Sequence, residues 1–108
     1  MIVRIWRGVT KLANADRYLQ YLNQFVMPAY QIANGHEGLL VLAERQGELV
    51  QFLLLSFWAS DQALASFVGA DPLMVNLSPE EKSLLIAFES TAKHYKVVYR
   101  SESSPVGK

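Results

Sequence analysis

The chain has 108 residues, a length that is typical of one domain. Apolar residues make up 51% of the chain and charged residues 19%, which favours a folded core and argues against disorder. The formal net charge is +0, so the basic excess of nucleic-acid-binding proteins is missing. There is no cysteine, which excludes a disulfide framework, thiolate chemistry and cysteine-ligated metals, and fits a reducing compartment.

The N-terminal stretch MIVRIWRGVT has arginines among its apolar residues and no small-residue cleavage site, so it is unlike a signal peptide. The longest mostly apolar run, residues 52–59, is far shorter than the roughly 20 residues that a membrane helix needs. We therefore expect a soluble, cytoplasmic protein that binds neither membranes nor nucleic acid.

The first elements are a strand and a helix. Residues 2–10, IVRIWRGVT, are rich in β-branched and aromatic side chains and predict strand one. Asn14 is a suitable N-cap for the first helix, in which Asp16 lies favourably in the first turn. Apolar residues then recur at helical spacing, at Tyr18, Leu22, Phe25, Val26 and Ala29. Pro28 interrupts this pattern and cannot donate a backbone hydrogen bond, so the helix should kink or restart there.

A loop and two further strands follow. Residues 34–38, NGHEG, are typical of a loop, and residues 39–45, LLVLAER, predict strand two. Residues 46–48, QGE, predict a tight hairpin turn into strand three, residues 49–59. Strand three is apolar on both faces, with Leu49, Leu53, Leu55 and Phe57 on one face and Val50, Phe52, Leu54 and Trp58 on the other. This pattern predicts a strand that is covered from both sides.

Two capping patterns predict two more helices. Ser60 or Asp61 caps the second helix, and Gly69 ends it. The stretch LSPEE has the form of a capping box, with Ser78 as the N-cap and Glu81 at the third helical position.

The order of the elements predicts the fold. Residues 94–100, HYKVVYR, alternate and predict strand four, while residues 101–108 read as a flexible polar tail. The order β-α-β-β-α-β over residues 1–100 predicts one α+β domain of the ferredoxin-like type, with an antiparallel sheet in the order 4-1-3-2. Helices cover one face of such a sheet. Because the other face is also apolar, we expect a homodimer formed through the sheet.

This topology brings four candidate site residues to one end of the sheet. The first helix returns Tyr30 to the beginning of strand one, where Arg4 lies, and the end of strand three and the start of strand two bring Trp58 and His36 to the same place. Arg4 and Trp6 share a face of strand one. Trp58 can be a core residue or the wall of a pocket between helix and sheet. Arg4 can reach solvent, pair with an acid or meet an anionic ligand.

The other ionisable residues are expected to lie apart from this group. His94 begins strand four, which predicts a position about 20 Å from Trp58 at ~3.3 Å per residue. The two histidines, His36 and His94, have no acidic partner at ligand spacing, so we expect no metal site. Glu80 and Glu81 are predicted to be solvated residues of a helix start. Nucleophile elbows, phosphate loops and dinucleotide motifs are absent.

Three stretches carry a family resemblance: IVRIWRGVT, the strand ending SFWAS before a helix, and the late KHYKVVY. With them, residues 1–100 resemble the antibiotic biosynthesis monooxygenase domain family. The resemblance implies ferredoxin-like domains that dimerise through their sheets into a dimeric α+β barrel. Some members oxygenate aromatic polyketides without metal or flavin, because the phenolate or carbanion of the substrate supplies electrons to oxygen. Related members degrade heme.

For this chain, the resemblance implies a cofactor-independent monooxygenase that oxidises a small aromatic or quinol-like compound with O2. Trp58 matches the tryptophan that these enzymes place on the pocket wall, where it would hydrogen-bond a substrate oxygen. Trp6 and Phe25 would be further substrate-binding residues. The alternative is a non-catalytic small-ligand-binding or dimerisation module of the same fold.

The remaining roles follow from side-chain chemistry. Arg4 would stabilise an oxyanion, and Tyr30 or His36 would transfer protons. The heme-degrading branch also needs a histidine after the tryptophan, and residues 60–69 contain none. The asparagine of that branch on strand one is replaced as well, since Trp6 or Arg7 stands near its place. These departures argue against heme degradation, and we expect no bound cofactor.

Overall fold

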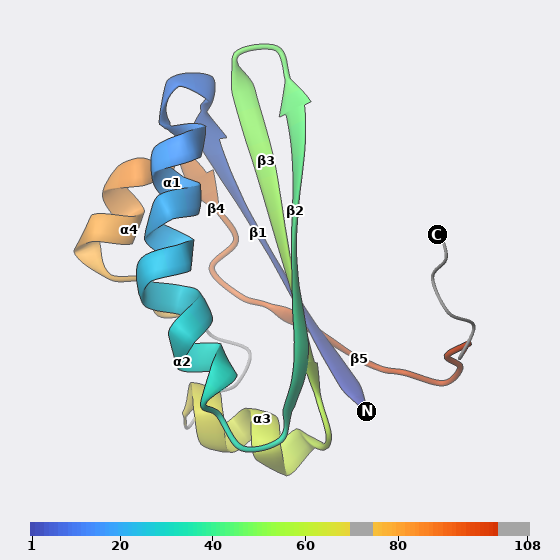
Figure 1. Ribbon diagram of the computed structural model, residues 1–108. Helices are drawn as coiled ribbons and strands as arrows, with labels where there is room; N and C mark the ends of the chain where they lie inside the picture. The colour runs from blue at the N-terminus through green and yellow to red at the C-terminus, as the bar shows by residue number, and fades with distance from the viewer. Residues whose placement is uncertain (70–74, 102–108) are drawn as a thin grey trace.

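The computed structural model describes residues 1–69 and 75–101 and has two layers, a sheet and helices packed on one of its faces (Figure 1). The strands are β1 (Ile2–Lys11), β2 (His36–Gln46), β3 (Leu49–Trp58), β4 (Ala87–Phe88) and β5 (Lys93–Lys96). The helices are α1 (Ala15–Tyr21), α2 (Met27–Gln31), α3 (Asp61–Val68) and α4 (Pro79–Leu84). A 3-10 turn, η1 (Leu12–Asn14), precedes α1, and a π-helical turn, η2 (Leu22–Val26), joins α1 to α2. No helix among these residues is long and apolar enough to cross a membrane.

The sheet is antiparallel and has the order that the sequence predicts. Its path runs β2-β3-β1-β4, and β5 also pairs with β1. Trp58 at the end of β3 stands opposite Ile2 on one side and His36 on the other. The β2–β3 hairpin turns at Gly47, whose φ of 64° is readily adopted by glycine. The predicted order 4-1-3-2 is therefore confirmed, with the fourth strand divided into β4 and β5.

The division of the fourth strand corrects the prediction for His94. The strand begins at Ala87, which stands opposite Val9, and not at His94. By the time the chain reaches His94 it has passed along most of β1, and His94 stands opposite Arg4. His94 therefore lies near the Trp58 end of the sheet, and the predicted separation of about 20 Å is wrong.

The first helix changes its winding just before Pro28, where the sequence predicts a kink or a restart. Met27 donates its backbone N–H to the carbonyl of Leu22, which closes a π turn. Pro28 then occupies the first turn of α2, where its missing N–H costs least. The helix therefore continues through Pro28 instead of ending there.

Serine caps begin α3 and α4, and of the two expected caps of α3, Ser60 and Asp61, the structure uses Ser60. Ser60 Oγ accepts a hydrogen bond from the backbone N–H of Ala63 at the start of α3, over 3.1 Å. Ser78 Oγ accepts one from the N–H of Glu81 at the start of α4, also over 3.1 Å. The polar tail predicted for residues 101–108 lies, beyond Ser101, outside the described residues.

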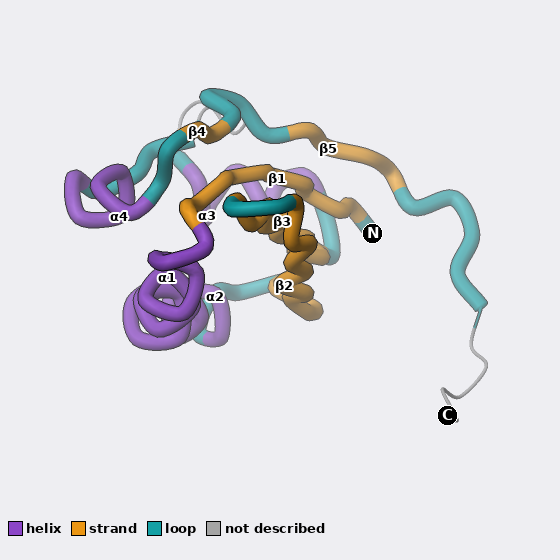
Figure 2. The backbone as a smooth tube through the Cα atoms, turned by 90° about the horizontal axis from the view of Figure 1, so that it is seen from above, coloured by secondary structure: helices purple, strands orange, loops and turns teal. Residues whose placement is uncertain are grey.

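The core lies between the helices and the sheet. Helices α1 and α2 lie on one side of the strands β1, β3 and β2 (Figure 2). The side chains of β3 that face these helices are buried: Val50, Phe52, Leu54, Ser56 and Trp58. The opposite face of β3 is apolar but only partly covered, so the expectation of a strand enclosed on both sides does not hold within a single chain.

Candidate functional site

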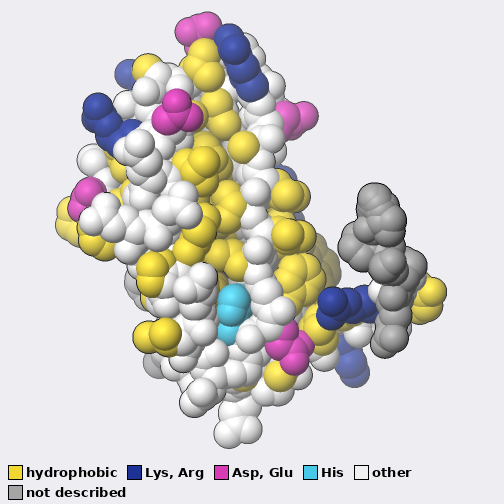
Figure 3. Space-filling model, viewed as in Figure 1, with side chains coloured by type: hydrophobic (Ala, Val, Ile, Leu, Met, Phe, Trp, Pro, Cys, Tyr) yellow, Lys and Arg dark blue, Asp and Glu magenta, His cyan; other side chains and the backbone are white. Residues whose placement is uncertain are grey.

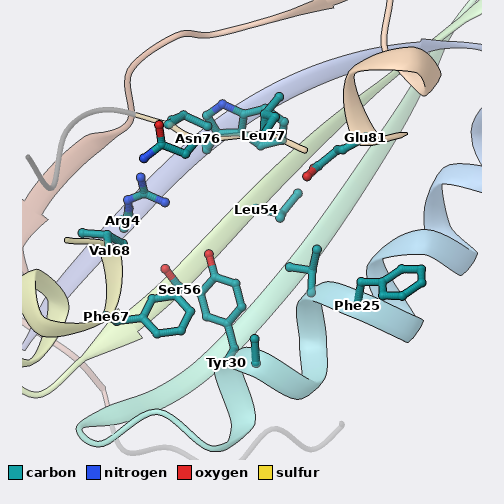
Figure 4. A pocket seen from close by; sticks show the side chains of 14 residues that line it. Arg4, Phe25, Tyr30, Leu54, Ser56, Phe67, Val68, Asn76, Leu77 and Glu81 are labelled. Carbon is teal, nitrogen blue, oxygen red and sulfur yellow. The ribbon is translucent and has the colours of Figure 1, made fainter. Parts of the chain in front are cut away.

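A cavity of about 330 Å³ lies between the helices and the sheet (Figure 4). Apolar side chains from η2, β3 and α3 form much of its wall, among them Val26, Leu54 and Phe67. Its polar lining comes from Arg4, Tyr30, Ser56, Asn76 and Glu81. A concave, mostly apolar site with a few polar groups is the usual form of a small-molecule site.

Arg4, Tyr30 and Ser56 form a polar group on the sheet side of the cavity. Arg4 and Ser56 are neighbours in register on β1 and β3, and Tyr30 reaches them from α2 (Figure 4). Arg4 is only 8% exposed. Burial raises the pKa of the Tyr30 hydroxyl, while the charge of Arg4 and hydrogen bonds with Arg4 and Ser56 oppose the rise. Tyr30 is therefore a neutral hydrogen-bonding group beside a buried cation, a pair that can hold an anionic oxygen.

Four aromatic rings pack together behind this polar group. Tyr30 lies 5.4 Å from His36 and 4.8 Å from Phe67 between ring centroids. Trp58 lies 5.2 Å from His36 and 5.0 Å from Phe67. The structure therefore brings Tyr30, His36 and Trp58 together at one end of the sheet, where the topology predicted them.

Trp58 does not lie on the cavity wall. Its side chain is 0% exposed, and its indole N–H donates a hydrogen bond to Ser56 Oγ over 2.9 Å. Tyr30 and Phe67 stand on the cavity lining, and both pack against its ring. This geometry corrects the expected hydrogen bond from Trp58 to a substrate oxygen, because the indole N–H already has a partner.

His36 also lies outside the cavity lining. It packs against Tyr30 and Trp58, and its Nε2 is buried without a hydrogen-bond partner among the residues that the structure describes.

Trp6 and Phe25 both line the cavity. Trp6 is buried, and its indole N–H donates to the backbone carbonyl of Glu89 over 2.7 Å, which fixes the ring. Phe25 belongs to the π turn and is 51% exposed, so it lies at the rim.

Glu81 is a site residue, although its place at a helix start predicted a solvated side chain. It is only 7% exposed, lines the cavity and accepts a hydrogen bond from the hydroxyl of Tyr18 over 2.8 Å. Burial raises the pKa of the Glu81 carboxyl, and the hydrogen bond from Tyr18 opposes the rise. Burial is the main cause of a raised pKa of the Tyr18 hydroxyl, and the charge of Glu81 raises this pKa further. One signal was available: a tyrosine on the core face of a helix needs a partner for its hydroxyl.

Metal-binding residues do not gather in the described part of the chain, in which no three His, Asp or Glu side chains are grouped to hold an ion.

The fold is the ferredoxin-like α+β fold, and similar solved structures carry it. A provisionally named antibiotic biosynthesis monooxygenase from Bacillus cereus matches with a TM-score of 0.69 at 11% identity, over 97% of this chain and 98% of that one. A monooxygenase from the gene ActVA-Orf6 of Streptomyces coelicolor, in complex with the ligand nanaomycin D, matches with a TM-score of 0.61 at 18% identity. The match covers 96% of this chain and 91% of that one. The heme degrader MhuD from Mycobacterium tuberculosis, with two hemes bound in its active site, matches with a TM-score of 0.61 at 17% identity. The match covers 94% of this chain and 99% of that one.

No family model matches the sequence, and no curated protein matches it either. At the identities above, the similarity establishes the fold. The resemblance to antibiotic biosynthesis monooxygenase domains is confirmed at that level.

Proposed function

We propose that this chain is a monooxygenase of the antibiotic biosynthesis type, which oxidises a small aromatic or quinol-like compound with O2 and without a bound cofactor. One observation carries the proposal: the cavity between helices and sheet holds the buried cation Arg4 beside the hydroxyls of Tyr30 and Ser56. The solved structures with this fold include a monooxygenase and a heme degrader, which supports a ligand-binding role for the cavity.

Arg4 would hold the oxygen of the substrate as it becomes anionic, and its positive charge would favour the phenolate over the phenol. Tyr30, kept neutral by burial, would donate a hydrogen bond to the same oxygen or return a proton to it. The phenolate or carbanion would give its electrons to O2. One oxygen atom would enter the product as a carbonyl in place of two hydrogens, and the other would leave as water, so the substrate supplies all the electrons.

Trp58 and His36 would act through other residues. Trp58 fixes Ser56 by a hydrogen bond and supports the ring of Tyr30. His36 packs against the rings of Tyr30 and Trp58. We therefore assign proton transfer to Tyr30 and positioning to Trp58 and His36.

The protein would work as a cytoplasmic homodimer. The sheet face opposite the helices carries half-exposed leucines and Tyr95, and a second copy of the chain offers a matching surface. The lack of cysteine fits the reducing conditions of the cytoplasm.

A non-catalytic ligand-binding module is the second candidate. It is favoured by the described cavity lining, which contains no histidine and therefore no group that ordinarily titrates near neutral pH.

Oxygen uptake with a panel of anthrones, naphthols and quinols separates the two candidates. The parent protein should consume O2 with at least one of these compounds, and Arg4→Gln should lower kcat/KM by about 100-fold because the developing anion loses its counter-charge. Arg7→Gln is the matched control, since Arg7 is on the same strand with its side chain 47% exposed. Binding without oxygen uptake would identify a binding module. Equal activity of Arg4→Gln and Arg7→Gln would overturn the assigned role of Arg4.

A further inference from the structure

The cavity has a second polar group, away from the one formed by Arg4, Tyr30 and Ser56. Glu81 enters the lining from α4, and its carboxyl group points toward the cavity (Figure 4). Tyr18, which holds Glu81, packs edge-on against Phe52, with ring centroids 5.0 Å apart. Phe52 and Ser56 are four residues apart on β3, about 13 Å at ~3.3 Å per residue. Apolar Leu54 lies between them and lines the cavity.

The two polar groups border one space. The charge of Glu81 contributes to the raised pKa of Tyr30, which lies with Arg4. A ligand in the cavity would therefore meet a cation and a hydroxyl near Ser56, an apolar wall at Leu54, and a carboxyl group toward Tyr18.

Glu81 retains capacity to bind a ligand. Oε2 accepts the hydrogen bond from Tyr18, and the side chain of Glu81 also lines the cavity. A buried carboxylate is stable only when it is well hydrogen-bonded, and each of its oxygens can accept more than one bond. A hydroxyl or amine of a ligand in the cavity would donate a further hydrogen bond to this carboxyl group.

We infer that Glu81, held in place by Tyr18, makes the site selective for aromatic substrates with two polar ends: an oxygen bound by Arg4 and Tyr30, and a hydroxyl or amine that donates to Glu81. This inference rests on the proposed function and narrows its substrate class to dihydroxy- or amino-hydroxy-aromatic compounds. A two-ring compound suits the size of the space, and the apolar wall between the polar ends suits its ring faces.

The competing explanation is structural, since the bond from Tyr18 to Glu81 also ties α1 to α4. Ligand selectivity separates the two, because a purely structural bond would change affinity for all ligands alike. Naphthalene-2,6-diol and 6-methoxy-2-naphthol are suitable probes. They share the ring system and one hydroxyl, and differ in whether the second oxygen can donate a hydrogen bond.

Calorimetric titration without O2 measures the ratio of the two affinities. The parent protein should bind the diol about tenfold more tightly than the ether, the value of one charge-assisted hydrogen bond. In Glu81→Gln the ratio should fall close to one, because the amide can also donate to the methoxy oxygen. Tyr18→Phe, which keeps the ring but frees the carboxyl, should lower the ratio as well. Glu80→Gln, at an exposed position of the same helical turn, is the matched control and should keep the parent ratio.

The outcomes distinguish this inference from the proposed function. Arg4→Gln should weaken both probes by a similar factor, because both present the first hydroxyl. An equal affinity of the parent protein for the two probes, or an unchanged ratio in both Glu81→Gln and Tyr18→Phe, would overturn the role of Glu81 and leave the proposed function standing. A parent protein that binds no compound of the panel would overturn the proposed function and this inference with it.

Discussion

At the residue scale, Trp58 shows how a residue can support a site without touching its ligand. The indole ring is fully enclosed, and its N–H is used by Ser56, a residue of the cavity lining. Tyr30 and Phe67 stand between the ring and the cavity, so their positions depend on the shape of Trp58. Any effect of Trp58 on a ligand would pass through these three residues.

Replacing Trp58 should therefore destabilise the fold as much as replacing a core residue does. We expect Trp58→Ala to lower the free energy of unfolding by about 3–5 kcal/mol, because it leaves a large void. Phe25→Ala is the control, since Phe25 lies half-exposed at the rim, and its cost should stay below about 1 kcal/mol. Urea unfolding of both variants gives the comparison. A cost of only about 1 kcal/mol for Trp58→Ala would indicate that the ring borders open space.

Glu81 should make the stability of the protein depend on pH. Burial raises the pKa of its carboxyl in the folded state above the ordinary 4.5, so the folded protein keeps this proton to a higher pH than the unfolded chain does. Glu81 therefore stabilises the fold most at pH values below the pKa that its carboxyl has in the unfolded chain. This stabilisation declines as the pH rises through the higher pKa of the folded state. Because an amide cannot ionise, Glu81→Gln should gain stability relative to the parent as pH rises from about 4 to about 7.

Urea unfolding at several pH values across this range measures the difference. Glu80→Gln is the control, because Glu80 is exposed in the same turn of α4. A difference between Glu81→Gln and the parent that stays flat with pH, or a gain that shrinks as pH rises, would contradict the assigned burial of Glu81.

At the scale of elements, local signals in the sequence predicted most of the fold. Ser78 caps α4 as expected, and Ser60, one of the two expected caps, caps α3. A π turn directly precedes Pro28, where a kink or a restart was predicted. Each of these features depends on residues within about two helical turns along the chain. The strand order followed from connection rules that need only the sequence of elements.

The misjudged features depend on contacts between distant residues or on very short segments. β4 has two residues, Ala87–Phe88, too few for a periodic pattern, so the fourth strand was predicted to begin too late and His94 was misplaced. Glu81 occupies a helix position that is usually solvated, but Tyr18, 63 residues away, draws it into the core. The alternation of side chains along β3 shows on which face of the sheet Trp58 lies. How deeply the Trp58 ring is buried depends on Tyr30 and Phe67, which pack against it.

At the scale of the whole molecule, the helices cover one face of the sheet and leave the other apolar. Leu40 on β2 is 49% exposed and Leu42 is 46% exposed, and they stand beside Leu55 and Leu53 of β3. Hydrophobic side chains follow the sheet on the side away from α1 (Figure 3). An apolar stripe along several strands favours association through the sheet.

We expect the protein to sediment at micromolar concentration with twice the 12.1 kDa mass of one chain. Replacing Leu40 and Leu42 together by glutamate should shift the protein toward the monomer, because four carboxylates would then be buried in a symmetric interface. Ile32→Glu is the matched control, since Ile32 is 85% exposed and follows α2 on the helical side of the sheet. The control should remain dimeric. A parent protein that sediments as a monomer, or a control that dissociates as readily as the double variant, would contradict assembly through this face. In a dimer built on this face the cavities would stay open, since they lie on the opposite side of each sheet.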